Sequence, residues 1–252
     1  MVGMNPAEFA NIANCERDFW WYRGMRMIMD RVLAPYLEGR KVGRVLEAGC
    51  GTGYFSHLLQ SERGWPVVPM DLSADGLRYA REMGLERAVQ GDTCTLPFAA
   101  GAFDIVLSMD VLPHLPPGAE NQAAKEMARV LAPGGLLVLR APALEILRSR
   151  HSQFVFEKQR FTKGRLAGMM ERAGLKVARC TYTNTLLLPV ALAKFRLWEP
   201  MMRKPVASGV DPVPGWLDKM LYAALAMEAR YLGAGGSFPV GQSLVLIGEK
   251  PR

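Results

Sequence analysis

The sequence predicts an α/β fold with one open, doubly wound, mostly parallel sheet. From residue 42 to residue 141, short apolar runs that read as buried strands alternate with stretches of helical spacing, which is the pattern of a parallel sheet with crossover helices. Glycines at positions 49, 51 and 53 directly follow the first of these strands. Open α/β sheets bind nucleotides at such strand-to-helix turns, so the same stretch predicts a ligand site.

Length and composition favour one domain. At 252 residues, half of them apolar, the chain can bury one full core with an insertion, whereas two independent domains would be cramped. No apolar run approaches the roughly 20 residues that span a bilayer, and the N-terminus lacks a basic region followed by an apolar core. We therefore expect a cytoplasmic protein without a membrane span. The four cysteines include no Cys-x-x-Cys pair, which indicates free thiols.

The turn after the first strand is built for close approach of a ligand. Val45 and Leu46 form a short buried strand, and the residues from Tyr54 to Gln60 have the apolar spacing of a helix. Every second residue of the turn between them is glycine. Because side chains are absent there, a ligand can contact the backbone directly.

A second strand ends on a carboxylate, Asp71, about 20 residues after the glycines, where such folds place an acid on a ribose. An alternative is that Asp71 only caps the helix that starts near Ser73. The glycine spacing argues against a dinucleotide site. In the dinucleotide-binding fingerprint the last two glycines are three positions apart, so that a pyrophosphate can bind at the helix N-terminus. Here they are two apart and follow Glu47, whose carboxylate would repel phosphate but suit a cationic ligand.

Three later segments complete a set of ordered motifs: Gly91–Phe98, Phe103–His114 and Arg129–Leu139. Together with the glycine turn and the acid after the second strand, they resemble the class I S-adenosylmethionine (SAM)-dependent methyltransferases of the small-molecule type. The resemblance covers about residues 42 to 141. It implies a Rossmann-like, doubly wound, seven-stranded sheet with an antiparallel last strand. It also implies SAM as the cofactor and S-adenosylhomocysteine as the product.

The resemblance further implies which residues hold the cofactor. The Asp71 carboxylate would bind the ribose hydroxyls, and Asp92, after the third strand, would bind the adenine amino group. Arg23 would meet the carboxylate of the ligand. The full predicted cofactor set is Glu47, Gly49, Gly51, Gly53, Asp71, Leu72, Asp92, Thr93, Met109 and Arg23.

Residues 1–40 are expected to form an N-terminal helical lid. They carry an aromatic cluster from Phe19 to Tyr22 within a helical stretch, and the resemblance implies a segment that folds over the cofactor. Trp21 and Tyr22 are therefore predicted substrate contacts. The alternative is a helix whose aromatic face simply packs on the sheet.

The predicted SAM-binding core, residues 41–183, ends with a helix capped by Thr162 and a strand from Leu175 to Tyr182, and residues 241–252 supply its last strand. Residues 184–240 are too many for a loop and are rich in Leu, Met and aromatic residues. We expect a helical insertion that contacts the substrate, with Tyr182 as a further contact. A homodimer interface or ordinary packing would explain the same composition.

His114 is the predicted catalytic residue. Methyl transfer from a sulfonium is an in-line displacement, for which an enzyme mainly aligns the nucleophile and excludes water. A hydroxyl or protonated amine also needs a general base, and the resemblance places His114 beside the methyl donor; a structural histidine is the alternative. Some similar enzymes have a glutamate before this histidine and hold a metal, whereas this chain has Pro113. We therefore predict no metal site.

The leading hypothesis is a SAM-dependent methyltransferase acting on oxygen or nitrogen of a small, cyclic or partly apolar metabolite. The net charge of +7 is compatible with a nucleic-acid partner. The sequence contains no recognisable nucleic-acid-binding module, so we expect a small-molecule acceptor instead. An RNA or protein methyltransferase is the alternative, although Met109-Asp-Val-Leu112 replaces the Asn/Asp-Pro-Pro-aromatic signature of nucleic-acid amino methylation. A non-catalytic SAM-binding module is the third hypothesis, because fold does not settle function.

Overall fold

The computed structural model describes residues 3–202, 206–208 and 213–252. Its centre is a seven-stranded sheet in the order β3-β2-β1-β4-β5-β7-β6. Strand β7 alone runs in the direction opposite to the other six strands, so the predicted doubly wound sheet with an antiparallel last strand is confirmed. The strands are β1 (Val45–Ala48), β2 (Val67–Asp71), β3 (Val89–Gln90), β4 (Phe103–Met109), β5 (Leu131–Pro142), β6 (Lys176–Thr183) and β7 (Ser243–Glu249).

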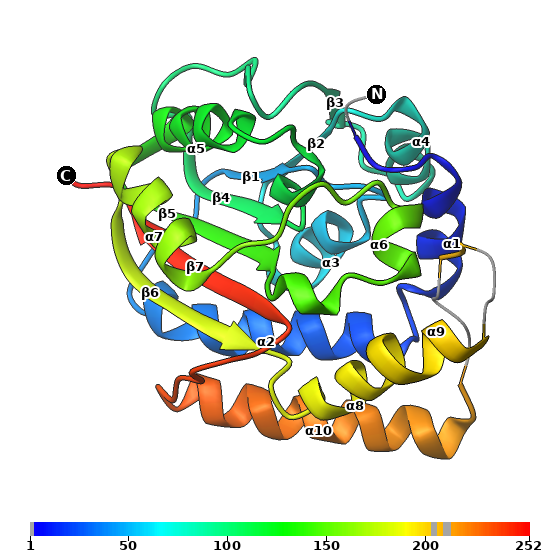
Figure 1. The fold of residues 1–252 in the computed structure, drawn as a ribbon. Coiled ribbons are helices and arrows are strands. Elements are labelled where there is room, and N and C mark those ends of the chain that lie inside the picture. The colour runs from blue at the N-terminus through cyan, green and yellow to red at the C-terminus, as the bar shows by residue number, and fades with distance from the viewer. Residues whose placement is uncertain (1–2, 203–205, 209–212) are drawn as a thin grey trace.

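Helices cover both faces of this sheet. In Figure 1, α2 and α10 run side by side along the lower edge, and α5 lies near the top. The helices are α1 (Ala7–Cys15), α2 (Trp20–Leu37), α3 (Tyr54–Arg63), α4 (Ala74–Glu82), α5 (Ala119–Val130), α6 (Arg150–Phe154), α7 (Lys163–Arg172), α8 (Leu188–Leu192), α9 (Glu199–Met202) and α10 (Gly215–Gly233), with a π-helical turn at Ala193–Trp198 and 3₁₀ turns at Leu112–His114 and Glu145–Leu147.

One apolar core lies on each side of the sheet, because successive strand residues point to opposite faces. Val45 of β1 packs with residues of α2, α3 and α10, whereas its neighbour Leu46 packs with residues of α5 and α7. Both side chains are fully buried. Because β1 is covered on both faces, its apolar residues Val45 and Leu46 are adjacent rather than at every second position. The adjacent pair itself therefore identified the strand.

The local signals for helix starts act as expected. Ser73 begins α4 with its side chain accepting from the backbone N–H of Gly76, and Thr162 begins α7 by accepting from that of Arg165. These contacts satisfy backbone donors that the first helical turn leaves unpaired. Both helix starts were therefore encoded locally.

The helices outside the α/β core pack on each other through α2 and α10. Gly24 of α2 faces Leu225 of α10 so closely that a Cβ on Gly24 would lie 2.2 Å from Leu225 Cδ1. The N-terminal segment and the insertion thus share one packed layer over the sheet. The division of the chain stays a prediction, with segments at residues 1–40, 41–183, 184–240 and 241–252. The lid functions of residues 1–40 and 184–240 stay predictions as well. Within the described ranges, no helix is long and apolar enough to cross a membrane.

We predict that Gly24→Ala lowers the free energy of unfolding by roughly 1–3 kcal/mol, the usual cost of overpacking, because the added methyl would push α2 away from Leu225. Unfolding in guanidinium chloride would measure this. Gly164→Ala in α7 is the matched control, because its added methyl meets nothing within 4 Å and a helical Gly→Ala change tends to stabilise. Equal effects at the two positions would show that the α2–α10 contact is not tight.

Candidate functional site

A cavity of about 910 Å³ lies at the carboxyl end of the sheet. It adjoins the glycine turn after β1 and the residues after β4, two neighbouring strands between which the strand order reverses. Open α/β sheets bind their ligands in the crevice at such a reversal. The volume is near the upper end of ordinary ligand pockets, so the cavity has room for more than one small ligand.

The Asp71 carboxylate organises the wall of this cavity. One oxygen accepts from the backbone N–H of Gly51 at 2.8 Å, and the other accepts from that of Ser73 at 2.8 Å. Gly51 has a left-handed φ of 56°, which a glycine adopts without strain. Because Ser73 itself supplies the side-chain cap of α4, Asp71 is more than a helix cap: it joins the turn after β1 to the turn after β2.

Most of the predicted cofactor residues come together around the cavity. Those that line it are Glu47, Gly49, Gly51, Asp71, Leu72, Asp92, Thr93 and Met109. Gly53 does not, since it lies behind the turn, where an added Cβ would be 2.6 Å from Ala80 Cβ; it serves the packing of α3 against α4. Arg23 is also outside the lining.

Arg23, a predicted ligand contact, points into the contact between two helices rather than into the cavity, and its role toward a ligand stays a prediction. Its guanidinium forms an ion pair with Asp218 of α10 at 3.3 Å and lies 4.2 Å from the centroid of the Tyr222 ring. These two partners hold Arg23 in the contact between α2 and α10. The sequence could not reveal them, because both lie nearly 200 residues further along the chain.

Two buried acids stand beside the glycine turn. Burial raises the pKa of Glu47 to about 8, although the Ser56 hydroxyl donates to its carboxylate. Burial likewise raises the pKa of Glu16 to about 7, against a hydrogen bond from Thr52 Oγ1 at 2.6 Å. Both residues line the cavity, and a cation bound near them would favour their ionised forms. Glu16 was missed by the sequence analysis because it precedes the motif.

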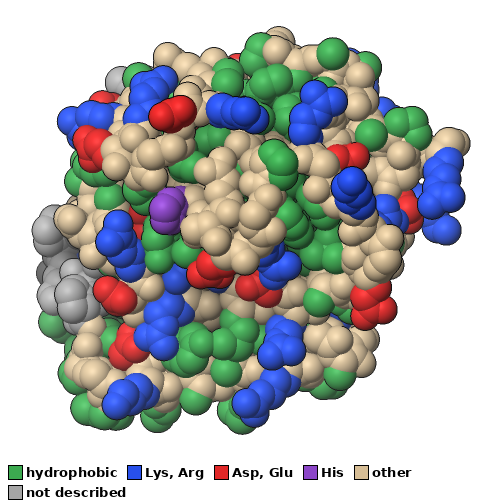
Figure 2. All heavy atoms as spheres, turned by 180° about the vertical axis from the view of Figure 1, so that it is seen from behind, with side chains coloured by type: hydrophobic (Ala, Val, Ile, Leu, Met, Phe, Trp, Pro, Cys, Tyr) green, Lys and Arg blue, Asp and Glu red, His purple; other side chains and the backbone are tan. Residues whose placement is uncertain are grey.

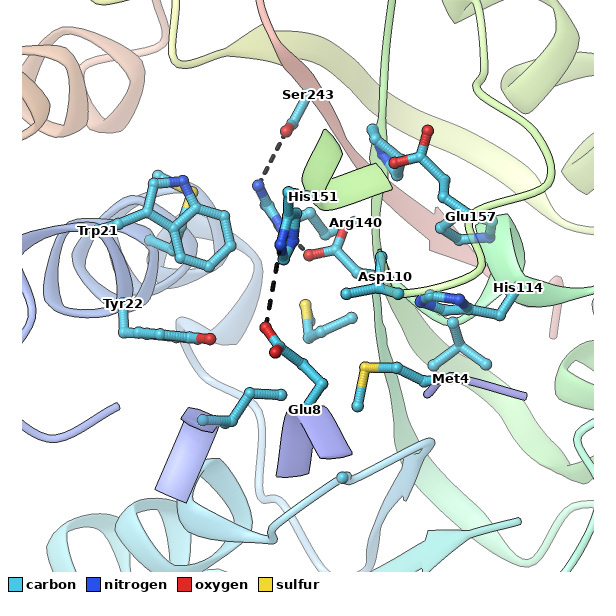
Figure 3. Close-up of a pocket in the computed structure, with 18 of the residues that line it drawn as sticks. Met4, Glu8, Trp21, Tyr22, Asp110, His114, Arg140, His151, Glu157 and Ser243 are labelled. Carbon is cyan, nitrogen blue, oxygen red and sulfur yellow. Dashed lines mark hydrogen bonds and ion pairs between the residues drawn. The ribbon is translucent and has the colours of Figure 1, made fainter. Parts of the chain in front are cut away.

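The other half of the cavity carries the predicted acceptor residues. Trp21 and Tyr22 lie on one side and Asp110 and His114 on the other (Figure 3). Burial raises the pKa of the Tyr22 hydroxyl, so Tyr22 is a neutral contact at physiological pH. Tyr182 is not among the lining residues. It lies opposite Leu244 in the β6–β7 pair and packs on the core, so its predicted role as a substrate contact stays untested.

His114 has the chemical state that a proton acceptor needs. It lies in the 3₁₀ turn after β4, and burial lowers the pKa of its imidazole to about 4, although Glu157 opposes this effect. The ring is therefore neutral at physiological pH. Its Nδ1 is buried and has no hydrogen-bond partner among the described residues, while the side chain lines the cavity.

An ion pair that the sequence analysis missed lies next to His114. Arg140, at the end of β5, pairs with Asp110 and donates from Nη2 to Ser243 Oγ at 2.8 Å (Figure 3). Its guanidinium lies 4.8 Å from the ring centroid of Trp21. Within the described part of the chain, Arg140 Nε and Asp110 Oδ1 are buried without partners. The arginine that closes the apolar run Leu136–Leu139 was the available signal.

Segments far apart in the sequence meet over the same cavity. Glu8 of α1 lies 3.9 Å from His151 of α6 and accepts from Ser208 Oγ at 2.9 Å. All three line the cavity. Among the residues that the structure describes, this cluster included, no group of three His, Cys, Asp or Glu side chains is arranged to hold a metal ion.

Comparison with known proteins agrees with this geometry. Residues 46–139 match a family model described as a methyltransferase domain. The chain is 35% identical over 99 residues to 2-methyl-6-phytyl-1,4-hydroquinone methyltransferase of Synechocystis sp., which covers 38% of this chain and 30% of that protein. It is 36% identical over 126 residues to probable tRNA methyltransferase 9B of Homo sapiens, covering 49% and 26% respectively. The chain thus spans less than half the length of these curated relatives.

The fold itself extends beyond the matched region. A solved structure, a putative sarcosine dimethylglycine methyltransferase from Galdieria sulphuraria, superimposes with a TM-score of 0.58 at 15% identity. The superposition covers 90% of this chain and 86% of that one. At this identity the likeness concerns the fold alone.

The depressed pKa of His114 predicts how stability depends on pH. The unfolded chain takes up a proton near pH 6.5 and the folded protein near pH 4, so lowering the pH through this window favours unfolding. Between pH 7 and pH 4, wild-type protein should lose about 3 kcal/mol more unfolding free energy than His114→Gln, whose amide does not titrate. Denaturant unfolding of both proteins across that range measures the difference. Parallel curves would contradict a buried, neutral His114.

Proposed function

Because the α/β core of this chain belongs to the class I SAM-dependent methyltransferase family, we propose that the protein transfers the methyl group of SAM to a small metabolite. The acceptor atom is an oxygen or nitrogen, on a molecule that is cyclic or partly apolar. One observation carries the proposal: a single cavity joins the turn held by Asp71 to a second half lined by aromatic side chains and a neutral histidine. Donor and acceptor can therefore meet away from water.

The residues on the glycine side suit SAM. When bound, SAM supplies a methyl group that is already activated by a positively charged sulfur. Asp71 and Asp92 offer carboxylate oxygens for hydroxyl and amino groups, and Glu47 and Glu16 offer negative charge to a cation once they ionise. Asp71 accepts from the backbone N–H groups of Gly51 and Ser73, and its two oxygens together have further lone pairs for a ribose.

The residues on the opposite side suit a compact acceptor with one polar group. Trp21 and Tyr22 provide apolar surface. The Arg140–Asp110 pair supplies both a donor and an acceptor, each with an atom that lacks a partner among the described residues, and can orient a hydroxyl or amine. His114 is then the general base that takes the acceptor's proton at Nδ1.

An RNA methyltransferase is the second candidate, because a tRNA methyltransferase is among the curated relatives. The buried acceptor half favours a small molecule, since a nucleotide in RNA would have to enter with its backbone attached. Incubation with methyl-labelled SAM separates these candidates. Label should enter the small-molecule fraction of a cell extract rather than its RNA or protein, and SAM binding with no transfer to any fraction would indicate a non-catalytic module.

We expect calorimetry to detect binding of SAM and S-adenosylhomocysteine but not of NAD. Asp71→Ala should weaken SAM binding by about 1.5–3 kcal/mol, the scale of lost charge-assisted hydrogen bonds. Asp75→Ala is the matched control, because Asp75 is an exposed carboxylate in the first turn of α4 and does not line the cavity. Unchanged affinity in Asp71→Ala, or tight NAD binding, would overturn the cofactor assignment.

A pair of substitutions tests whether His114 removes a proton. If it does, His114→Ala should lower the rate of transfer to the identified acceptor by the 10²–10⁴-fold typical of general-base loss. His114→Gln should be nearly as slow, because an amide can orient a hydroxyl but cannot accept its proton at neutral pH. Near-normal turnover of the Gln variant would reduce the role to orientation. Near-normal turnover of both would mean that the acceptor needs alignment alone.

A further inference from the structure

The outer face of α10 carries a continuous apolar stripe. Its inner face is buried through Leu221, Leu225 and Leu232. On the opposite side, large side chains are exposed at helical spacing over the length of the helix: Trp216 (69%), Met220 (56%), Met227 (58%) and Tyr231 (49%). Residues at such intervals lie on one face of a helix. A monomeric soluble protein seldom exposes so many large apolar side chains in one row.

The other helices of the insertion also expose apolar side chains. Exposed apolar side chains also occur along α8, the π-helical turn and α9, namely Val190, Leu197, Trp198, Met201 and Met202. The same elements wall the cavity from the inside, with Lys194, Leu217 and Leu221 among its lining residues. We call the exposed apolar side chains of α8 to α10 the outer patch.

The charges around the outer patch are basic. Exposed Lys194, Arg196, Lys219 and Arg230 lie on its helices. Figure 2 shows hydrophobic and basic side chains side by side along the lower edge, which α10 occupies in Figure 1.

The acids of these helices do not offset that charge. Glu199 forms an ion pair with Arg150 at 3.6 Å and Asp218 forms one with Arg23 at 3.3 Å. The third acid, Glu228, is buried and accepts from three backbone N–H groups. The surface offered to a partner is therefore apolar and positively charged.

This combination distinguishes between partners. If α10 paired with α10 of a second copy about a twofold axis, Lys219 and Arg230 would approach the basic residues of that copy and repel them. The two acids of α10, Asp218 and Glu228, could not compensate, because each already binds a group within its own chain. An anionic lipid surface matches both properties. Its headgroups attract lysine and arginine, while tryptophan, tyrosine and methionine insert at the boundary of the acyl chains.

We propose that the outer patch docks the protein on an anionic lipid bilayer, with α10 lying in the plane of the interface. The docking is peripheral, since within the described ranges no helix is suited to span a membrane. It requires no ligand in the cavity, so it can be tested independently of the methyltransferase proposal.

Vesicle flotation of the full chain is the direct test. The protein should float with vesicles of equal parts phosphatidylglycerol and phosphatidylcholine, and much less with phosphatidylcholine alone. Lys219→Gln combined with Arg230→Gln should weaken the affinity for the anionic vesicles about 25-fold, since each basic residue at such a surface contributes about fivefold. Lys125→Gln with Arg87→Gln is the matched charge control, because both residues are exposed and neither belongs to α8–α10.

The apolar part of the patch is tested by Met220→Glu with Met227→Glu, which should abolish flotation, against Met220→Leu with Met227→Leu, which should retain it. An unchanged circular-dichroism spectrum and thermal unfolding midpoint in all variants confirm that they fold. Failure of wild-type protein to bind anionic vesicles at low salt would overturn the proposal, as would binding that the patch variants leave intact. A concentration-dependent dimer without vesicle binding, broken by the Glu variant and kept by the Leu variant, would assign the patch to a second copy instead.

Discussion

The hydrogen bonds of the Asp71 carboxylate are the constraint on which the site depends. They tie the backbone of Gly51, after β1, to that of Ser73, after β2, and burial makes such bonds costly to leave unmade. The sheet determines where β1 and β2 end, and the Asp71 carboxylate determines the relative positions of the loops that follow them. The glycine side of the cavity is therefore formed before any ligand arrives, and binding need not supply the free energy to order it.

The opposite side of the cavity is organised by buried polar groups that the protein satisfies incompletely. Burial lowers the pKa of Arg140 to about 10, so it stays charged beside Asp110, while burial keeps His114 neutral. Asp110 adopts a left-handed φ of 56°, a conformation that costs free energy for a residue other than glycine and is concentrated at functional sites. Among the described residues, Asp110 Oδ1, Arg140 Nε and His114 Nδ1 are buried without hydrogen-bond partners, which makes this network costly for the protein unless another group satisfies it.

The layer formed by α2 and α10 connects the site to the surface of the molecule. Its close contact at Gly24 and Leu225 places Trp21 and Tyr22 on the cavity and leaves the outer patch facing solvent. Arg23, which follows Tyr22 in the sequence, is held outside the cavity by Asp218 and Tyr222. One helix thus contributes to both packing and recognition, because neighbouring residues of a helix point in different directions.

The sequence by itself determined the α/β class, the helix starts at Ser73 and Thr162, and most of the glycine side of the cavity. These features depend on short stretches in which a strand, a turn and a helix follow one another, so local pattern is sufficient. The tertiary structure alone decided that Glu8, Glu16, Asp110 and Arg140 share the cavity with His114, and that Arg23 and Tyr182 do not. Those outcomes depend on contacts between segments up to nearly 200 residues apart, whose partners are chosen by packing and burial and leave no periodic signal in the sequence.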